Sequence, residues 1–278
     1  MSSAPCRTLV LLPPLGHDSA LYAPLAGALG DRAEVQALDY PGFGARALGT
    51  FDYTAPALFE RLLDDVRAQL TERGVARAPY ALGGVSLGAT LSIALAGQLA
   101  HPPAQLLLMA SGGRRVARIR RETVRTAIYE RGAAAFAREH LGLDHGDLER
   151  SSLRQHIGLD GPGVRTYFAH YFDQIWNPRD FDARAVAATQ MLDAALDVDL
   201  EDALRANRIP AALLWGDADR IFNAKHTERL RELIAHSVLH VLPGVGHYPP
   251  LECPAHVADI FLRTTCGAPL ATPESLDS

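Results

Sequence analysis

A serine between two glycines is the residue of this sequence best placed for covalent chemistry. Ser86 stands in the pattern Gly84-x-Ser86-x-Gly88, directly after one apolar run and directly before another that reads as a helix. A sharp turn from strand to helix lifts a serine hydroxyl clear of the backbone, and the glycines leave room where strand and helix approach closely. The start of the helix adds partial positive charge where an oxyanion would form. The pattern therefore predicts a nucleophilic serine.

Such a serine needs a base, and the base needs a residue that orients it. His247 lies in a Gly-rich loop, and Asp217 and Asp219 lie in Trp-Gly-Asp-Ala-Asp; both segments follow apolar runs that predict strands. The carboxyl ends of parallel strands meet at one edge of a sheet, so these residues can converge on Ser86. His247 would accept the serine proton and return it, while a buried carboxylate fixes the imidazole tautomer. The other aspartate would then be a turn or capping residue.

The elements that must position these residues alternate along most of the chain. Buried strands are predicted at 8–12, 35–38, 80–85, 106–110, 211–215 and 238–242, and helices at 19–29, 57–73, the run after Ser86, 224–235 and 255–264. This alternation predicts an α/β fold with a mostly parallel, doubly wound sheet and helices on both faces.

One long segment interrupts the alternation. Residues 114–205 look helical, polar and aromatic, without clear strands, and they follow a strand end, where an insertion lies over the ligand crevice. We therefore predict a core of residues 1–113 and 206–266 with an inserted helical cap at 114–205. The tail 267–278, rich in Ala, Pro, Ser and acidic residues, is predicted to be disordered.

Composition narrows the function classes. The chain has 278 residues, 48% of them hydrophobic and 21% charged, and a net charge of -5, which suits a globular protein and argues against general nucleic-acid binding. Three scattered cysteines form neither a disulfide framework nor a metal motif, and no dinucleotide fingerprint is present. No signal segment or membrane-length apolar run is visible. We expect a cytoplasmic protein without metal or cofactor, and without membrane or nucleic-acid partners.

Four motifs at strand ends give the chain a family resemblance. They are Leu-Leu-Pro-Pro-Leu-Gly after the first strand, Asp39-x-Pro41-Gly42-x-Gly44, Gly84-x-Ser86-x-Gly88, and the pair Trp-Gly-Asp-Ala-Asp and Gly-Val-Gly-His. In these motifs and their order the chain resembles the α/β-hydrolase family over nearly everything outside the cap. Few residues precede the first strand, so the resemblance implies a trimmed sheet of about six parallel strands. It also implies Ser86 as nucleophile, Asp219 rather than Asp217 as acid, and His247 as base.

The resemblance implies an oxyanion hole built from two backbone N–H groups. One is that of Leu87, directly after the nucleophile, and by alignment the other is that of Leu15. Most family members carry His-Gly where this chain has Pro13 and Pro14, and Pro14 has no N–H to donate. The geometry of this oxyanion hole therefore has to be read from the structure.

Substrate-contacting candidates lie in two places. His17, just beyond Leu15, could touch substrate, or it could simply belong to the start of the next helix. The cap carries an aromatic group with three members on one helical face, comprising Phe168, Tyr171, Phe172 and Trp176. This group either packs the cap onto the core or lines a pocket for an apolar or aromatic acyl group.

A basic stripe opens the cap. Arg114, Arg118, Arg121 and Arg125 are spaced by four, three and four residues, which places them on one helical face. The stripe is either a solvated helix face or a receiver for an anionic partner. An acyl carrier protein or the phosphates of CoA would fit, because the arginine fork donates two parallel hydrogen bonds to phosphate.

Three functions follow from these residues. The first is a serine hydrolase that cleaves a small-molecule ester, lactone or thioester through an acyl-enzyme. The second uses the same triad as a carbon–carbon bond hydrolase, acyl transferase or cyclase. The third is a non-catalytic ligand-binding protein that retained the fold, which the intact Ser, Asp and His set disfavours.

Overall fold

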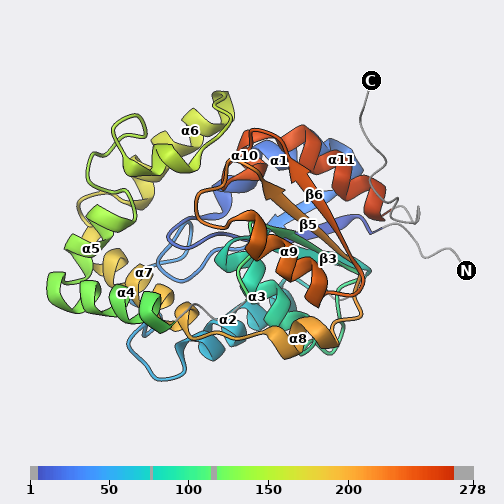
Figure 1. The fold of residues 1–278 in the computed structure, drawn as a ribbon, viewed down its shortest axis with the longest axis horizontal. Helices are drawn as coiled ribbons and strands as arrows, with labels where there is room; N and C mark the ends of the chain where they lie inside the picture. The colour runs from blue at the N-terminus through green and yellow to red at the C-terminus, as the bar shows by residue number, and fades with distance from the viewer. Residues whose placement is uncertain (1–5, 76–77, 114–117, 266–278) are drawn as a thin grey trace, which may run out of the picture.

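A computed structural model describes residues 6–75, 78–113 and 118–265. Arg114 of the basic stripe, Cys266 and the expected disordered tail lie outside these residues. Within them the chain forms a sheet layered between helices, with a group of helices standing off to one side (Figure 1).

The sheet has six strands, all parallel, in the order β2-β1-β3-β4-β5-β6. The strands are β1 (Thr8–Leu12), β2 (Glu34–Ala37), β3 (Tyr80–Val85), β4 (Gln105–Met109), β5 (Ala211–Gly216) and β6 (Ser237–Leu242). The four central strands are buried almost throughout, which explains why their sequences are continuous apolar runs, while the two edge strands are mostly half-buried. The predicted fold class and trimmed sheet are confirmed.

Helices cover both faces of the sheet (Figure 1). One face carries η1 (Ser19–Tyr22), α1 (Ala23–Leu29), η2 (Gly30–Arg32), α10 (Pro249–Glu252) and α11 (Pro254–Thr265). The other carries α2 (Leu58–Glu72), α3 (Leu87–Ala96), α8 (Glu201–Ala206) and α9 (Ala224–Leu233). The expected helix at 19–29 thus divides into a 3₁₀ turn and an α-helix, with Pro24 in the first turn of the latter.

The strand order reverses between β1 and β3. The chain runs from β1 outward to β2, then returns past β1 to β3 and continues in the opposite direction. Loops that leave the carboxyl ends of β1 and β3 diverge to opposite faces and leave a crevice between them. The loop of residues 13–17 and the turn at Ser86 therefore flank the position where such a sheet binds ligands.

After β4 the chain forms a group of helices that stands to one side of the sheet (Figure 1). We use the name cap for residues 118–196, which form α4 (Arg118–Arg131), α5 (Ala133–His140), η4 (Ser152–His156), α6 (Pro162–His170), the π-helical turn η5 (Tyr171–Ile175) and α7 (Phe181–Leu196). Helix α7 packs on α4 and α5 within the cap and on α2 of the core.

The end of the inserted segment belongs with the core. Helix α8 packs against α3 and α9, and the backbone N–H of Leu200 donates to the carbonyl of Gly113 over 3.1 Å. The expected boundary at residue 205 falls inside α8, because a short amphipathic helix carries no sequence mark of the layer it joins.

A buried carboxylate organises the turn after β2. Asp39 accepts hydrogen bonds from the N–H of Ser19 at 2.6 Å and of Ala45 at 3.1 Å, so it ties the start of η1 to its own loop. Gly44 has φ +59°, and a Cβ there would lie 2.4 Å from the carboxyl group of Asp39. The Asp-x-Pro-Gly-x-Gly motif thus has a structural role, because it holds the loops beside the crevice in place.

We predict that Gly44→Ala lowers the free energy of unfolding by about 3 kcal/mol, because the new methyl group displaces the Asp39 carboxylate as well as straining the backbone. Gly49→Ala is the matched control, since Gly49 has φ +82° but open space around it, and should cost only about 1 kcal/mol. Urea unfolding measures both. Equal losses would show that the carboxylate contact contributes nothing beyond the positive φ.

Candidate active site

Ser86 occupies a strained turn between β3 and α3. Its backbone has φ 55° and ψ -112°, a conformation that costs a non-glycine residue about 1–3 kcal/mol. Hydrogen bonds hold it on both sides: the N–H of Ser86 donates to the carbonyl of Met109 at 3.0 Å, and its carbonyl accepts from the N–H of Thr90 at 3.1 Å. Strain of this kind, held by the surrounding structure, is typical of functional sites.

The two flanking glycines are required by contact with β1. A Cβ on Gly84 would lie 2.4 Å from the carbonyl oxygen of Leu12, and a Cβ on Gly88 would lie 1.9 Å from the same atom. Any side chain at either position would force strand, turn and helix apart. The turn predicted from the glycine spacing is therefore present, with a reason specific to each glycine.

Two tyrosines fix the backbone around the turn. The hydroxyl of Tyr22 donates to the carbonyl of Leu12 at 2.5 Å and accepts from the N–H of Val85 at 3.1 Å. The hydroxyl of Tyr40 donates to the carbonyl of Pro13 at 2.9 Å. Sequence reasoning missed both, because a single tyrosine in a helix or loop gives no pattern.

The loop after β1 forms a tight turn beside Ser86. The N–H of His17 donates to the carbonyl of Pro14 at 3.2 Å, and Gly16 adopts φ +74°, which a side chain would disfavour. Leu15 is half-buried in this turn, and Leu87 is the first residue of α3. The two predicted oxyanion donors thus come from the two loops that flank the crevice, and their role stays a prediction.

His247 and Asp219 form a buried pair. Nδ1 of His247 lies 2.9 Å from Oδ2 of Asp219, and both side chains are almost fully enclosed. The other oxygen, Oδ1, accepts from the N–H groups of Ile221 at 2.7 Å and Phe222 at 3.2 Å. Burial raises the pKa of Asp219, but His247 and these hydrogen bonds outweigh it and hold the pKa below its usual value. The carboxylate is therefore kept charged beside the imidazole.

Asp217, the competing carboxylate, has a different task. It is exposed, and its Oδ1 accepts from the N–H of Gly244 at 2.7 Å, at the start of the loop that carries His247. The structure thus gives Asp219 the contact with the imidazole and Asp217 a contact with the loop backbone.

His17 lies in an aromatic cluster between core and cap. It is 3% exposed; its Nδ1 is 2.9 Å from the hydroxyl of Tyr167, its Nε2 is 3.3 Å from that of Tyr248, and its ring stacks on Tyr171 at 4.5 Å between centroids. Burial, followed by the nearby His247, lowers the pKa of His17 to about 3. The imidazole is therefore neutral at neutral pH.

The predicted cap aromatics gather in the same cluster. Phe168, Tyr171 and Trp176 are buried, and Phe172 is half-buried. The indole Nε1–H of Trp176 donates to the carbonyl of Gly16 at 3.0 Å, which joins the cap to the loop after β1. These side chains therefore pack the cap onto the core.

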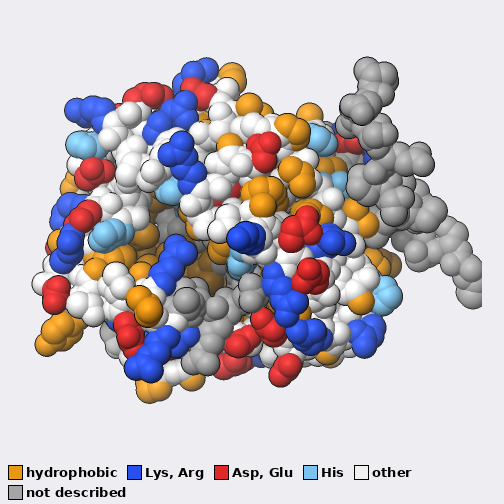
Figure 2. Space-filling view, in the orientation of Figure 1, with side chains coloured by type: hydrophobic (Ala, Val, Ile, Leu, Met, Phe, Trp, Pro, Cys, Tyr) orange, Lys and Arg blue, Asp and Glu red, His pale blue; other side chains and the backbone are white. Residues whose placement is uncertain are grey.

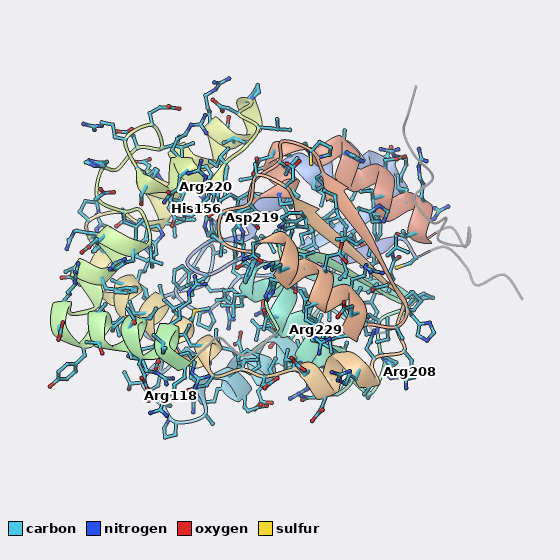
Figure 3. The ribbon with its side chains drawn as sticks, viewed as in Figure 1. Arg118, His156, Arg208, Asp219, Arg220 and Arg229 are labelled. Atoms are coloured by element: carbon cyan, nitrogen blue, oxygen red, sulfur yellow. The ribbon has the colours of Figure 1, made fainter. Side chains whose placement is uncertain are left out.

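A hollow opens between the cap and the sheet edge. Figure 2 shows hydrophobic side chains within it and basic side chains at its rim. In Figure 3, His156, Asp219 and Arg220 lie close to one another at this junction. Burial, followed by the nearness of His247, lowers the pKa of His156, so the cap supplies a neutral imidazole beside the triad candidates.

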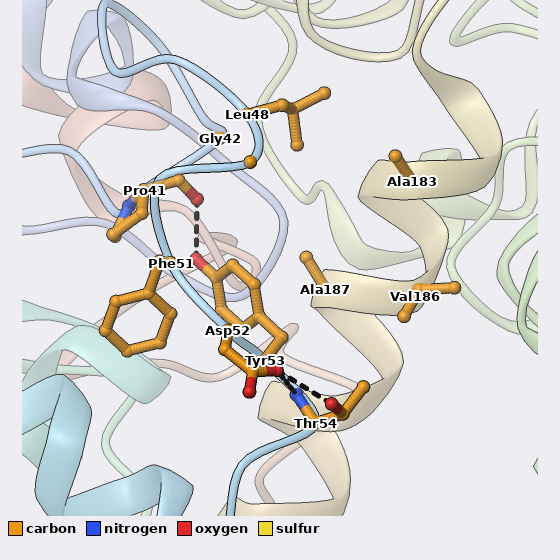
Figure 4. Close-up of a pocket in the computed structure, with 11 residues that line it drawn as sticks. Pro41, Gly42, Leu48, Phe51, Asp52, Tyr53, Thr54, Ala183, Val186 and Ala187 are labelled. Carbon is orange, nitrogen blue, oxygen red and sulfur yellow. Dashed lines mark hydrogen bonds between the residues drawn. The ribbon is translucent and has the colours of Figure 1, made fainter.

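A separate cavity of about 280 Å³ lies between the loop after β2 and α7 (Figure 4). Its walls include Leu48, Phe51, Tyr53, Val186 and Ala187. The hydroxyl of Tyr53 donates to the carbonyl of Pro41 at 2.5 Å on the core side. None of the triad candidates lines this cavity, which we interpret as a gap at the junction of cap and core.

The three described arginines of the basic stripe pair with acidic residues of α4 and of the end of α7. Arg125 forms ion pairs with Asp193 and Asp197, and Nε of Arg121 lies 3.2 Å from a carboxylate oxygen of Asp197. Arg118 is exposed, and its Nε lies 2.7 Å from Oε1 of Glu122, one helical turn later. Two of the stripe arginines therefore hold α4 against the end of α7.

The described residues lack two kinds of feature. Among them, no group of three or more His, Cys, Asp or Glu side chains is arranged to hold a metal ion. In the same ranges, no helix combines the length and the apolar character needed to cross a membrane.

The family follows from a comparison of the whole sequence. A model of the alpha/beta hydrolase family matches residues 9–260, which includes both the core and the cap. The chain belongs to the alpha/beta hydrolase family. A curated relative is the biotin biosynthesis bifunctional protein BioHC of Cellvibrio japonicus (strain Ueda107), 28% identical over 250 residues. The match covers 86% of this chain and 43% of that protein, so the chain spans less than half of the relative.

Three solved structures share the fold of this alpha/beta hydrolase. MenH from S. aureus has a TM-score of 0.74 at 17% identity, covering 95% of this chain and 97% of its own. A thermophilic esterase from Thermogutta terrifontis has 0.70 at 21%, covering 95% and 92%. The enol-lactonase from Burkholderia xenovorans LB400 has 0.66 at 22%, covering 94% and 90%. At these identities the likeness supports the fold.

We predict that His17 makes this family member lose stability on acidification. The unfolded chain protonates His17 near pH 6.5, whereas the folded chain holds it neutral down to about pH 3. Between these values the unfolded state binds more protons, so stability falls as the pH falls. His17→Gln should flatten the decline between about pH 6 and pH 4 by roughly 1 kcal/mol per pH unit.

Urea unfolding across this range measures the slope for each protein. His236→Gln, at an exposed histidine, should leave the slope unchanged. A slope that His17→Gln does not alter would mean that the buried ring is protonated in the folded state.

Proposed function

We propose that this protein is a serine hydrolase that cleaves an ester, lactone or thioester of a small apolar or aromatic acyl group through an acyl-enzyme. Ser86 is the nucleophile, His247 the base and Asp219 the orienting acid. The observation that supports this most directly is the buried Asp219–His247 pair at the sheet edge where the strained Ser86 turn also lies.

The hydrogen bond of His247 fixes its working tautomer. Asp219 is held as a carboxylate and can only accept, so Nδ1 of His247 carries the proton. Its Nε2 then presents a lone pair, which takes the Ser86 proton as the hydroxyl oxygen attacks the acyl carbon. The imidazolium returns that proton to the leaving alcohol or thiol. Water, deprotonated in the same way, releases the acid and restores Ser86.

The oxyanion of each tetrahedral intermediate would lie at the N-terminus of α3. The N–H of Leu87 belongs to that terminus, where helix charge is partly positive. The N–H of Leu15 comes from the turn that Gly16 and the Trp176 indole hold in place. Pro13 and Pro14 fit this arrangement, because the turn uses their carbonyl groups and needs neither N–H.

The substrate class rests on the surroundings of these groups. The neighbouring side chains are aromatic, and His17 is neutral, so the site suits an uncharged acyl group. Solved structures of the same fold include an esterase and an enol-lactonase, which supports cleavage at an acyl–oxygen bond. A carbon–carbon bond hydrolase, transferase or cyclase would use the same three residues and differ only in the bond presented to Ser86.

An acyl carrier protein or CoA as partner has weaker support. The relative BioHC is a biotin biosynthesis protein, but Arg121 and Arg125 already bind carboxylates at the end of α7. A phosphate could reach them only by breaking these ion pairs. The anionic-partner proposal therefore depends on Arg118 and Arg120, which are exposed.

Ser86→Ala tests the nucleophile. The wild-type protein should react covalently with a fluorophosphonate at Ser86 and hydrolyse at least one of a panel of p-nitrophenyl esters, lactones and acyl thioesters. The variant should lose both labelling and turnover. Labelling that persists in Ser86→Ala would place the nucleophile elsewhere.

The two aspartates form a matched pair for testing the acid. Asp219→Asn should lower kcat/KM by about 10³–10⁴, because the amide leaves the imidazole in the wrong tautomer without an orienting charge. Asp217→Asn removes one charge from a hydrogen bond to a loop backbone and should cost less than about tenfold. Steady-state kinetics on the best ester of the panel measures both, and the reverse order would assign the acid to Asp217.

A further inference from the structure

One carboxylate accepts four backbone hydrogen bonds next to the proposed base. Oε2 of Glu252 accepts from the N–H groups of Gly158 at 2.8 Å, Leu159 at 2.9 Å and Gly246 at 2.8 Å. Its Oε1 accepts from the N–H of Tyr248 at 3.0 Å. A carboxylate in such a position makes charge-assisted bonds that are stronger than bonds between neutral groups.

These four donors come from two segments far apart in the sequence. Gly158 and Leu159 lie in the cap, two and three residues after the end of η4, whereas Gly246 and Tyr248 are the two neighbours of His247. One carboxylate therefore holds the backbone on both sides of His247 and the cap at the same time.

The cap segment also contacts the histidine loop directly. The N–H of His247 donates to the carbonyl of His156 at 2.8 Å. A Cβ on Gly158 would lie 1.9 Å from the carbonyl oxygen of Gly244, and a Cβ on Gly246 would lie 2.2 Å from the carbonyl oxygen of His156. The two backbones pack so closely that glycine is required on each side.

We propose that Glu252 is a positioning residue: it sets the backbone of His247 and couples that backbone to the docking of cap segment 156–159. This inference rests on the proposed function, in which His247 is the catalytic base. The imidazole ring is fixed at Nδ1 by Asp219, but its Nε2 reaches Ser86 only if the main chain beneath it stays in place. An error of about 1 Å at a reacting group can lower a rate about a hundredfold.

Glu252→Gln tests the proposal with little change in size. The amide replaces one oxygen with an NH₂ group, which faces backbone donors that it cannot accept from. We expect kcat to fall about tenfold to a hundredfold, with KM within about twofold, because the loop that carries the base is displaced and the acyl pocket is kept. Glu60→Gln, at an exposed carboxylate on α2, is the control and should match the wild type.

Gly158→Ala tests the coupling from the cap side. It leaves Glu252 and His247 intact but pushes the cap segment away from the loop, so kcat should fall by a similar factor. Gly161→Ala is its matched control, because Gly161 lies three residues on with nothing within 4 Å of its Cβ. For all variants, rates are normalised to the fraction of protein that the fluorophosphonate has labelled when the labelling reaction is complete.

Amide hydrogen exchange separates this proposal from the proposed function. In Glu252→Gln, the amides of residues 158, 159, 246 and 248 should exchange faster, whether or not the wild type hydrolyses any ester tested. Unchanged exchange, or lower stability with kcat per labelled site unchanged, would overturn the positioning role. Failure of the wild type to label at Ser86 would instead overturn the proposed function. The exchange result would then still test whether Glu252 holds the cap segment and the histidine loop together.

Discussion

The carbonyl oxygen of Leu12 lies where strand β1, the Ser86 turn and helix α3 meet. This oxygen accepts a hydrogen bond from the hydroxyl of Tyr22 at 2.5 Å. A Cβ added to Gly84 would lie 2.4 Å from it, and a Cβ added to Gly88 would lie 1.9 Å from it. Because these contacts leave no space, the turn cannot relax its strained φ without separating β1 from β3 at the point where the strand order reverses. The crevice between the two loops and the backbone conformation of Ser86 thus depend on the same close packing.

The cap is joined to the core by polar contacts on several sides. The Trp176 indole reaches the carbonyl of Gly16, Arg184 donates to the carbonyl of Gly42 at 2.9 Å, and His170 pairs with the buried Asp18 at 2.7 Å. The acceptors lie in loops that leave the carboxyl ends of strands or precede the next helix. The cap is therefore fastened to the loops around the crevice, so a motion of the cap would first change the positions of those loops.

The sequence predicts the fold well because buried parallel strands read as apolar runs and the turns between them carry glycine and proline. It also places Ser86, Asp219 and His247 after strand ends, and the structure shows the contact between the last two. Tyr22 and Glu252 escaped prediction because their partners are backbone atoms distant in sequence, which leave no residue pattern. His17 was predicted as a substrate contact or a helix start; that its ring is enclosed by Tyr167 and Tyr248 depends on how the cap folds back.

The loop that carries His247 shows why the histidine can be singled out from the sequence, whereas the contacts that hold its main chain cannot. Asp217 binds the start of this loop at Gly244, and Glu252 binds the residues on either side of the histidine. All these contacts end on main-chain N–H groups, which every residue except proline offers, so residue identity constrains only the acceptor and the glycines that allow approach. The histidine ring itself needs one partner, Asp219. The main chain of this loop is therefore held by two carboxylates that do not touch the ring, and the close approach of Gly158 brings the cap against the same loop.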